Sequence, residues 1–343
     1  MALPGAILFS YGPASMRRFR ESDPRVTVRI LTCSTKHAGT VAQVEGVALA
    51  VARKLTAEDG RPVEIVRHHW RHDLLLHVPL LSRSRHFDVI ISSGSSGARK
   101  ALRQRASNPA LIWVHLEALV YRRGLPDLHA VPAHDWRDEF QTPAHLKMAG
   151  SPHRVRREDV EQRRLAARER QGVLPGERVA VFLIGGTSRA VAMDITAAKA
   201  VARQLERVAG SRYRCFVTLS RRSPPQARAV LEAVRHPAIT IWDGTGDNPY
   251  LDYLAIADCL FVTEDSISMT CEAAMAGRPL YRLALTPLPG PALEKLRRFQ
   301  SHWSAFQLPA EAFRPDAEWG DRVAPDDAEA VAARTVELMR RLT

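Results

Sequence analysis

Residues 259–274 read CLFVTEDSISMTCEAA, and this stretch decides the fold class. Its first five residues form an apolar run, which is typical of a strand buried on both faces of a sheet. The run ends at Thr263, and a helix is predicted to begin near Ser266, with Asp265 or Ser266 as its N-cap. A buried strand that passes through a short turn into a helix is the repeating unit of a parallel sheet covered by helices.

The same alternation continues in both directions along the chain. Strands are predicted at residues 26–31, 63–67, 87–92, 111–116, 178–184, 215–219, 239–242, 259–263 and 279–284. Helices are predicted at residues 40–55, 98–105, 154–171, 194–209, 225–234, 250–257 and 266–276, and a last helix, capped by Asp326 and Asp327, ends near Leu342. The sequence therefore predicts an α/β protein with two Rossmann-like doubly wound domains that face each other across a cleft.

The chain length of 343 residues suits two domains. The junction is placed near Ser151, after a stretch rich in Pro, His and Asp with weak periodicity. We expect residues 1–24 to be an extension, residues 25–150 the N-terminal domain and residues 151–325 the C-terminal domain. Residues 326–343 are expected to be a C-terminal helix, for which packing back on the N-terminal domain is one option.

The formal net charge is +12, and the excess lies in the first half of the chain. Residues 1–170 hold 28 Lys and Arg against 17 Asp and Glu, whereas residues 171–343 hold 21 against 20. Such asymmetry indicates an anionic partner, the alternative being a solvated Arg-rich surface. Nucleic acid is not favoured, because zinc-finger spacing, an RNA-binding aromatic signature and a basic coiled coil are all missing from the sequence. An anionic membrane surface or a phosphorylated lipid is the better candidate.

The four cysteines are Cys33, Cys215, Cys259 and Cys271, and no two of them form a CxxC pair. Neither a zinc site nor a redox pair is therefore expected, and Cys215 and Cys259 are predicted to be buried in strands. No stretch approaches the roughly 20 apolar residues of a transmembrane helix. We expect a reducing, cytoplasmic location, with peripheral attachment to the inner face of the cytoplasmic membrane left open.

Ligands of open α/β sheets lie at the carboxyl ends of the strands, and the polar loops of this chain fall there. The helix that begins near Ser266 presents free N–H groups and a partial positive charge, which suit a diphosphate. Glu272, about one and a half turns further on, is placed to accept hydrogen bonds from ribose hydroxyls. The competing interpretation is that Asp265, Ser266 and Ser268 only cap a helix.

Three more loops in the second half carry similar groups. The Gly-Gly turn at 185–186 lets the backbone approach a ligand, Arg221 and Arg222 can neutralise a diphosphate, and residues 243–250 can read a nucleobase. Each of these loops can equally be structural. The residues expected to bind the nucleotide are Gly185, Gly186, Thr187, Ser188, Ser220, Arg221, Arg222, Asn248, Tyr250, Glu264, Asp265, Ser266, Ser268, Met269 and Glu272.

The first half offers two turns and one candidate base. Ser92 to Gly97 (SSGSSG) is predicted to be a flexible turn between strand and helix, suited to an acceptor group or a phosphate. The residues expected on this side are Lys36, His37, Gly39, Gly94, Ser95 and Ser96. His134, next to Asp135, is the candidate general base, because an imidazole beside a carboxylate can take a proton from a hydroxyl.

The run WDGTGDNPYLDYLAIADCLFVTEDSISMTCEAAMAGRPLY at 242–281 resembles the mitochondrial fission protein family of the plant elongated-mitochondria type, which has many bacterial members. The runs FLIGGTSR (182–189), TLSRRSPP (218–225), PAHD (132–135) and SPHRV (151–155) match the same pattern, as does the segment around His302, Trp303 and Phe306. The sequence departs from this pattern after the first strand, where Cys33 stands in place of an expected Asp, and at 93–96, where SGSS replaces a Gly-Cys-Gly-Arg-like turn.

The family is similar to GT-B glycosyltransferases, in arrangement to the enzyme that adds N-acetylglucosamine to lipid I. The resemblance implies that the C-terminal domain holds a nucleotide sugar, with a UDP-sugar as the expected donor, and that the N-terminal domain binds an anionic or lipid-linked acceptor. It implies Glu272 on the ribose and Ser266, Ser268 and Met269 near the diphosphate, with no cofactor and no required metal. The alternatives are a nucleotide-sugar epimerase or hydrolase of the same fold, and a non-catalytic membrane-associated adaptor.

Overall fold

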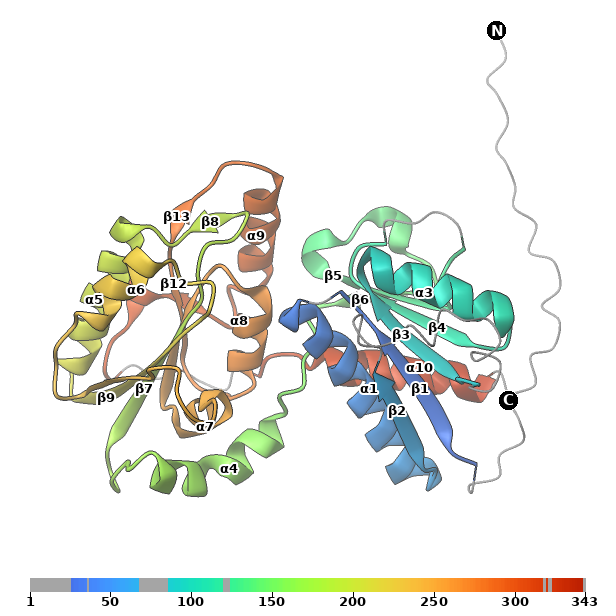
Figure 1. The fold of residues 1–343 in the computed structure, drawn as a ribbon, viewed down its shortest axis with the longest axis horizontal. Coiled ribbons are helices and arrows are strands. Elements are labelled where there is room, and N and C mark those ends of the chain that lie inside the picture. Colours follow the sequence, from blue (N-terminus) through green and yellow to red (C-terminus); the bar gives the residue numbers. More distant parts are fainter. Residues whose placement is uncertain are drawn as a thin grey trace, which may run out of the picture.

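The computed structural model of the chain describes residues 26–35, 37–67, 86–119, 124–316, 319 and 323–341. Two α/β domains lie side by side, each with one parallel sheet (Figure 1). The expected extension at residues 1–24 lies outside the described residues. The two sheets confirm the predicted α/β class and its doubly wound domains.

The sheet of the first domain has the strand order β2-β1-β3-β4-β5-β6, and every pairing is parallel. Its strands are β1 (Val28–Cys33), β2 (Val63–Arg67), β3 (Val89–Ser93), β4 (Ile112–Leu116), β5 (Leu128–Pro132) and β6 (His145–Met148). Its helices are α1 (Ala38–Asp59) and α3 (Gly94–Ser107), with 3-10 turns η2 (Ala133–Asp135) and η3 (Asp138–Phe140). Helices alternate with parallel strands because each crossover must return the chain to the same end of the sheet.

Successive residues of the central strands point to opposite faces of this sheet, and each face has its own core. Ile30 packs with apolar residues of α1 and of the final helix α10 (Asp327–Arg341). Leu31, the next residue, packs on the other face with Ala98 and Ala101 of α3. The continuous apolar run of each strand is thus explained by burial on both faces.

The sheet of the second domain is also parallel, with the order β10-β9-β7-β11-β12-β14. Its strands are β7 (Arg178–Ile184), β9 (Tyr213–Leu219), β10 (Ile239–Ile241), β11 (Cys259–Thr263), β12 (Leu280–Leu283) and β14 (Leu308–Pro309), and a small antiparallel pair joins β8 (Val191–Ala192) to β13 (Thr286–Pro287). Its helices are α4 (Arg157–Arg170), α5 (Ile195–Ala209), α6 (Pro225–Glu232), α7 (Tyr250–Ile256), α8 (Ile267–Ala274), α9 (Pro291–His302) and the turn η4 (Ala310–Ala312).

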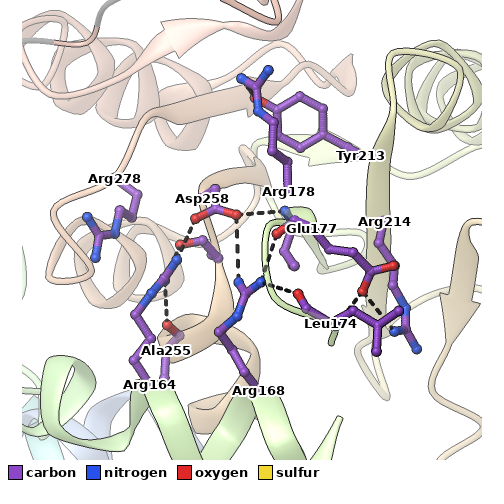
Figure 2. Close-up of polar contacts among 12 residues, drawn as sticks. Arg164, Arg168, Leu174, Glu177, Arg178, Tyr213, Arg214, Ala255, Asp258 and Arg278 are labelled. Atoms are coloured by element: carbon purple, nitrogen blue, oxygen red, sulfur yellow. Dashed lines mark hydrogen bonds and ion pairs between the residues drawn. The ribbon is translucent and has the colours of Figure 1, made fainter. Parts of the chain in front are cut away.

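Helix α4, the charged helix after the junction, is fixed to the second domain by arginines. Asp258 accepts hydrogen bonds from Arg164 and from the backbone N–H of Val179, the latter at 2.7 Å. Arg168 donates to the backbone carbonyls of Leu174 and Glu177 (Figure 2). These contacts lie at the end of the sheet where β7 begins, so they hold the domain together without taking part in the loops at the carboxyl ends.

The expected elements differ from the observed ones in several places, including the unpredicted short strands β8, β13 and β14. The predicted flexible turn at 92–97 is wrong, because Ser92 and Ser93 end β3 and Gly94 already begins α3. Strands β5 and β6 lie in the stretch of weak periodicity before residue 152, and helix α9 was not predicted from the sequence. Asp326 caps α10, accepting the backbone N–H of Glu329 at 3.0 Å, whereas Asp327 faces the domain junction.

Candidate functional site

A cleft of about 1100 Å³ is lined by residues of both domains. The first domain contributes the start of α1 and the residue that follows β4. The second domain contributes the loops after β9 and β10 and the start of α8. The residues on its wall are His37, Ala38, Gly39, Thr40, Ala42, Gln43, Glu117, Arg154, Val155, Ser220, Arg221, Arg222, Asn248, Tyr250, Leu251, Asp265, Ser266, Ile267, Ser268, Met269 and Glu272. As the rule for open α/β sheets requires, the groups lie at the carboxyl ends of the strands.

The start of α8 faces this cleft with its N–H groups. Ser266 is the N-cap, and its hydroxyl accepts the backbone N–H of Met269 at 3.3 Å. The first N–H groups of a helix have no partner inside it, and they carry a partial positive charge. Because Ser266, Ile267 and Ser268 line the cleft, this end of the helix can receive an anionic group.

Asp265 joins three segments behind this helix start. Its side chain is fully buried and accepts hydrogen bonds from Thr263 Oγ1 at 2.7 Å, from the backbone N–H of Gly186 at 3.0 Å and from Arg222 at 2.9 Å. Burial raises the pKa of Asp265, against the lowering effect of these three donors. The carboxylate therefore fixes the turn after β7 and the Arg222 loop relative to α8.

The two glycines of the turn after β7 are explained by these neighbours. A Cβ at Gly185 would lie 2.1 Å from an Asp265 carboxylate oxygen, and one at Gly186 would lie 2.1 Å from the Arg222 carbonyl oxygen. The sequence suggested that the backbone of this turn comes close to a ligand. In the structure it comes close to Asp265 and Arg222 of the protein, and neither glycine lines the cleft.

Glu272 lies one turn deeper on α8 and contacts helix α7. Tyr250 donates its hydroxyl to Glu272 Oε2 at 2.6 Å. Burial raises the pKa of Glu272, whereas the Tyr250 hydroxyl and the charge of Arg154 lower it. The carboxylate has a second oxygen and lies on the cleft wall, so it can accept further hydrogen bonds from hydroxyl groups.

The loop after β9 brings positive charge to the same wall. Arg221 and Arg222 both line the cleft, and the side chain of Arg222 is half exposed. Ser220 Oγ accepts the backbone N–H of Arg222 at 3.1 Å, and Asn248 Oδ1 accepts that of Tyr250 at 3.0 Å. Ser220 and Asn248 thus shape their own loops while lining the cleft.

The opposite wall holds residues that the sequence predictions missed. Gln43, Glu117 and Arg154 line the cleft beside the predicted His37 and Gly39. Arg154 donates to Glu45 at 3.1 Å. The signal for Glu117 was its position directly after a buried strand, and Arg154 lies inside the segment SPHRV.

Several predicted residues lie elsewhere in the second domain. Thr187 and Ser188 use their hydroxyl oxygens within their own turn, accepting the backbone N–H groups of Met193 and Ala190, each at 3.2 Å. Glu264 accepts Leu285 N–H at 2.8 Å and Gln300 Nε2 at 2.7 Å, so it connects β11 with α9. None of these three residues lines the cleft.

In the first domain, Gly94, Ser95 and Ser96 form the first turn of α3 and do not line the described wall of the cleft. Lys36 lies outside the described residues. Gly39, by contrast, stands close to the second domain, since a Cβ there would lie 3.4 Å from Ser268 Oγ.

His134 and Asp135 lie in a second cavity, of about 870 Å³, and not in the cleft. Asp135 accepts Lys295 Nζ of α9 at 2.5 Å, and its carboxylate is 3.9 Å from His134 Nε2. Burial lowers the pKa of His134 to about 4, and the positive charges of Lys295 and Arg298 lower it further, against the effect of Asp135. The expected His–Asp pair is thus part of the contact between η2 and α9.

Within the described ranges, no three His, Cys, Asp or Glu side chains gather as a metal ion would need. All four cysteines are buried, as predicted for Cys215 and Cys259. Among the helices that the structure describes, none combines the length and the apolar character needed to cross a membrane.

Solved structures with this fold include complexes with UDP-GlcNAc and with UDP. UDP-GlcNAc 2-epimerase from Neisseria meningitidis bound to UDP-GlcNAc matches with a TM-score of 0.53 and 10% identity, over 92% of this chain and all of the other. The MnaA-UDP structure from S. aureus matches with a TM-score of 0.54 and 11% identity, over 92% of this chain and 98% of that one. The fold is accordingly of the GT-B type, with two Rossmann-like domains and a cleft between them.

The family model of mitochondrial fission ELM1 matches residues 38–339, and the chain belongs to this family. Mitochondrial fission protein ELM1 of Arabidopsis thaliana is 39% identical over 67 residues, which are 19% of this chain and 16% of that protein. An uncharacterised protein of Rickettsia prowazekii, RP120, is 41% identical over 70 residues, 19% of this chain and 20% of that protein. The matched stretch thus spans a fifth or less of either relative. The predicted family is confirmed.

Proposed function

We propose that the cleft binds a nucleoside-diphosphate sugar and that the protein transfers the sugar to an acceptor. One observation carries this proposal. The start of α8, the two arginines Arg221 and Arg222, and the carboxylate of Glu272 all line the same wall of the cleft. Helix N–H groups and arginines stabilise a diphosphate, and a carboxylate pairs with ribose hydroxyls. A departing diphosphate needs positive potential to stabilise its charge. In the proposed reaction the helix N–H groups and the arginines supply it, and the proposal includes no metal ion.

The acceptor side of the proposal rests on charge. The excess of Lys and Arg lies in the first 170 residues, and Arg154 lies on the cleft wall. An anionic or lipid-linked acceptor at a membrane surface suits that charge. Among donors we place UDP-sugars first, since the Neisseria enzyme of the same fold is bound to UDP-GlcNAc.

Nucleotide binding is tested by thermal shift with UDP, GDP, CMP, ADP and their sugars. A ligand at about 100 times its Kd stabilises the folded state by about 2.7 kcal/mol, which raises Tm by several degrees. We expect one nucleotide to produce this shift in the wild-type protein and Glu272→Ala to lose it. Glu294→Ala is the matched control, because Glu294 is an exposed carboxylate of α9 that pairs with Arg297.

The outcomes separate the three functions. If no nucleotide raises Tm, the donor site is contradicted. The remaining alternative is then a non-catalytic, membrane-associated adaptor. A shift accompanied by release of free sugar at the same rate with and without an added acceptor contradicts transfer and favours an epimerase or hydrolase.

A further inference from the structure

Glu117, the residue after β4, has an unusual backbone on the cleft wall. Its φ is +68°, and Arg212 is the one other non-glycine residue with positive φ among those described. Residues with a side chain rarely adopt this conformation, and it persists where the surroundings enforce it, often at functional sites. Here Glu117 donates its N–H to the Ala130 carbonyl at 2.9 Å, and its own carbonyl lies 2.7 Å from His129 Nε2.

This backbone places the carboxylate against neutral donors on the cleft wall. Gln43 Nε2 donates to Glu117 Oε1 at 2.8 Å, and Ser93 Oγ lies 3.4 Å from Oε2. Both of these partners are neutral groups. A carboxylate that neutral donors hold in place on a cleft wall can act as a general base.

The same carboxylate is connected to the start of α8. Gln43 Nε2 also contacts Ser151 Oγ at 2.8 Å, and Ser151 Oγ lies 3.4 Å from Ser268 Oγ. Two side chains therefore link Glu117 of the first domain to the helix turn that faces the anion site of the second domain.

Gln43 carries an unsatisfied acceptor in this connection. Its side chain is 4% exposed, and its Oε1 is buried without a hydrogen-bond partner among the described residues. The amide nitrogen of the same side chain is fully used, since it bonds both Glu117 and Ser151, so Gln43 is held in one orientation behind the carboxylate.

We propose that Glu117 is the proton acceptor of the transfer reaction and that Gln43 orients Glu117. This inference rests on the proposed function. The acceptor oxygen forms a bond to the anomeric carbon while its proton passes to a Glu117 oxygen. The bond between the anomeric carbon and the diphosphate oxygen breaks, and its electron pair leaves on the diphosphate. The acceptor is thus a hydroxyl-bearing molecule.

The test compares Glu117→Gln with the wild-type protein, using the nucleotide sugar that gives the largest thermal shift. Release of the nucleoside diphosphate is measured with octyl β-glucoside as the hydroxyl-bearing probe. We expect kcat to fall about 10²–10⁴-fold, the usual contribution of a general base, while the thermal shift stays at its wild-type value. Formate should restore part of the turnover of Glu117→Ala, which a purely structural role would not allow. The matched control is Glu139→Gln, an exposed carboxylate of η3.

Turnover of Glu117→Gln at the wild-type rate overturns the inference. So does a wild-type protein that binds the nucleotide sugar and releases no diphosphate with the probe, and that result leaves the donor site standing. A wild-type protein without any nucleotide shift overturns the proposed function itself, so the two failures are distinguishable. If Glu117→Gln is too unstable to assay, Glu117→Asp takes its place. The Tm of Glu117→Asp is measured alongside its turnover.

Discussion

At the scale of single residues, Asp327 is a buried carboxyl group that connects two segments of the chain. Its two carboxylate oxygens accept the backbone N–H groups of Ala149 at 2.8 Å and of Gly150 at 2.7 Å. It thereby joins the start of α10 to the segment between the domains. Burial raises the pKa of Asp327 to about 6, against the lowering effect of the two N–H donors.

This raised pKa predicts a pH dependence of stability. The folded state holds the proton up to about pH 6, whereas the unfolded chain loses it near pH 4, so the free energy of unfolding falls as pH rises between these values. Asp327 should contribute a fall of about 3 kcal/mol, since each pKa unit corresponds to about 1.4 kcal/mol. Urea unfolding from pH 4 to pH 7 measures it in the difference between wild type and Asp327→Asn. Curves that run parallel over this range would contradict the assignment.

The side chains of the site show what the sequence can and cannot predict. Ser266 and Glu272 lie on the cleft wall because a helix after a buried strand fixes their places by local geometry alone, and their role in nucleotide binding stays a prediction. His134 lies in another cavity, where it contacts Arg298 and Phe299 of α9, more than 150 residues later. Which donors meet which acceptors depends on tertiary packing, which no local pattern records.

At the scale of elements, the accuracy of the strand predictions did not follow position in the sheet. The edge strands β2 and β10 were predicted, whereas the interior strand β5 and the edge strands β6 and β14 were not. β11 was predicted at its observed bounds because it is buried on both faces and therefore reads as one apolar run. β14, at the edge of its sheet, has two residues and no such run. β6 is only partly buried and its pattern mixes polar and apolar residues, so its hydrophobic signal is weak.

Helix α1 packs against the segment between the domains so closely that one glycine is required. A Cβ at Gly46 would lie 2.2 Å from the carbonyl oxygen of His153, a backbone atom that cannot turn aside. Alanine would favour the helix by about 1 kcal/mol, but overpacking costs about 1–3 kcal/mol and more where backbone is struck. We expect Gly46→Ala to lower the free energy of unfolding by about 2 kcal/mol.

Denaturant unfolding of Gly46→Ala measures this loss, and Gly210→Ala is the control. Gly210 ends α5 with φ −63°, and a Cβ there would come no nearer than 3.3 Å to another atom. Gly46→Ala with unchanged or higher stability would show that the segment after residue 150 moves away from α1.

At the scale of the whole molecule, the chain crosses between the domains twice. It leaves the first domain near Ser151, builds the second domain, and returns as α10 to pack beside α1 (Figure 1). Val331, Ala332, Val336 and Met339 of α10 belong to the same core cluster as α1 and the strands of the first sheet. The first domain therefore completes its core with the last residues of the chain, which the sequence order alone leaves open.

This arrangement predicts that damage to α10 acts on the distant first half of the chain. Val331 is fully buried, and the change Val331→Asp places an unpaired carboxylate in the core of the first domain, at a cost of more than about 4 kcal/mol. Hydrogen exchange followed by mass spectrometry should show lost protection in β1, β3 and β4, while β7, β9 and β11 stay protected because their core contains no residue of α10. Protection lost equally in both sheets would mean that the domains unfold as one unit, and protection kept in both would place α10 outside the core of the first domain.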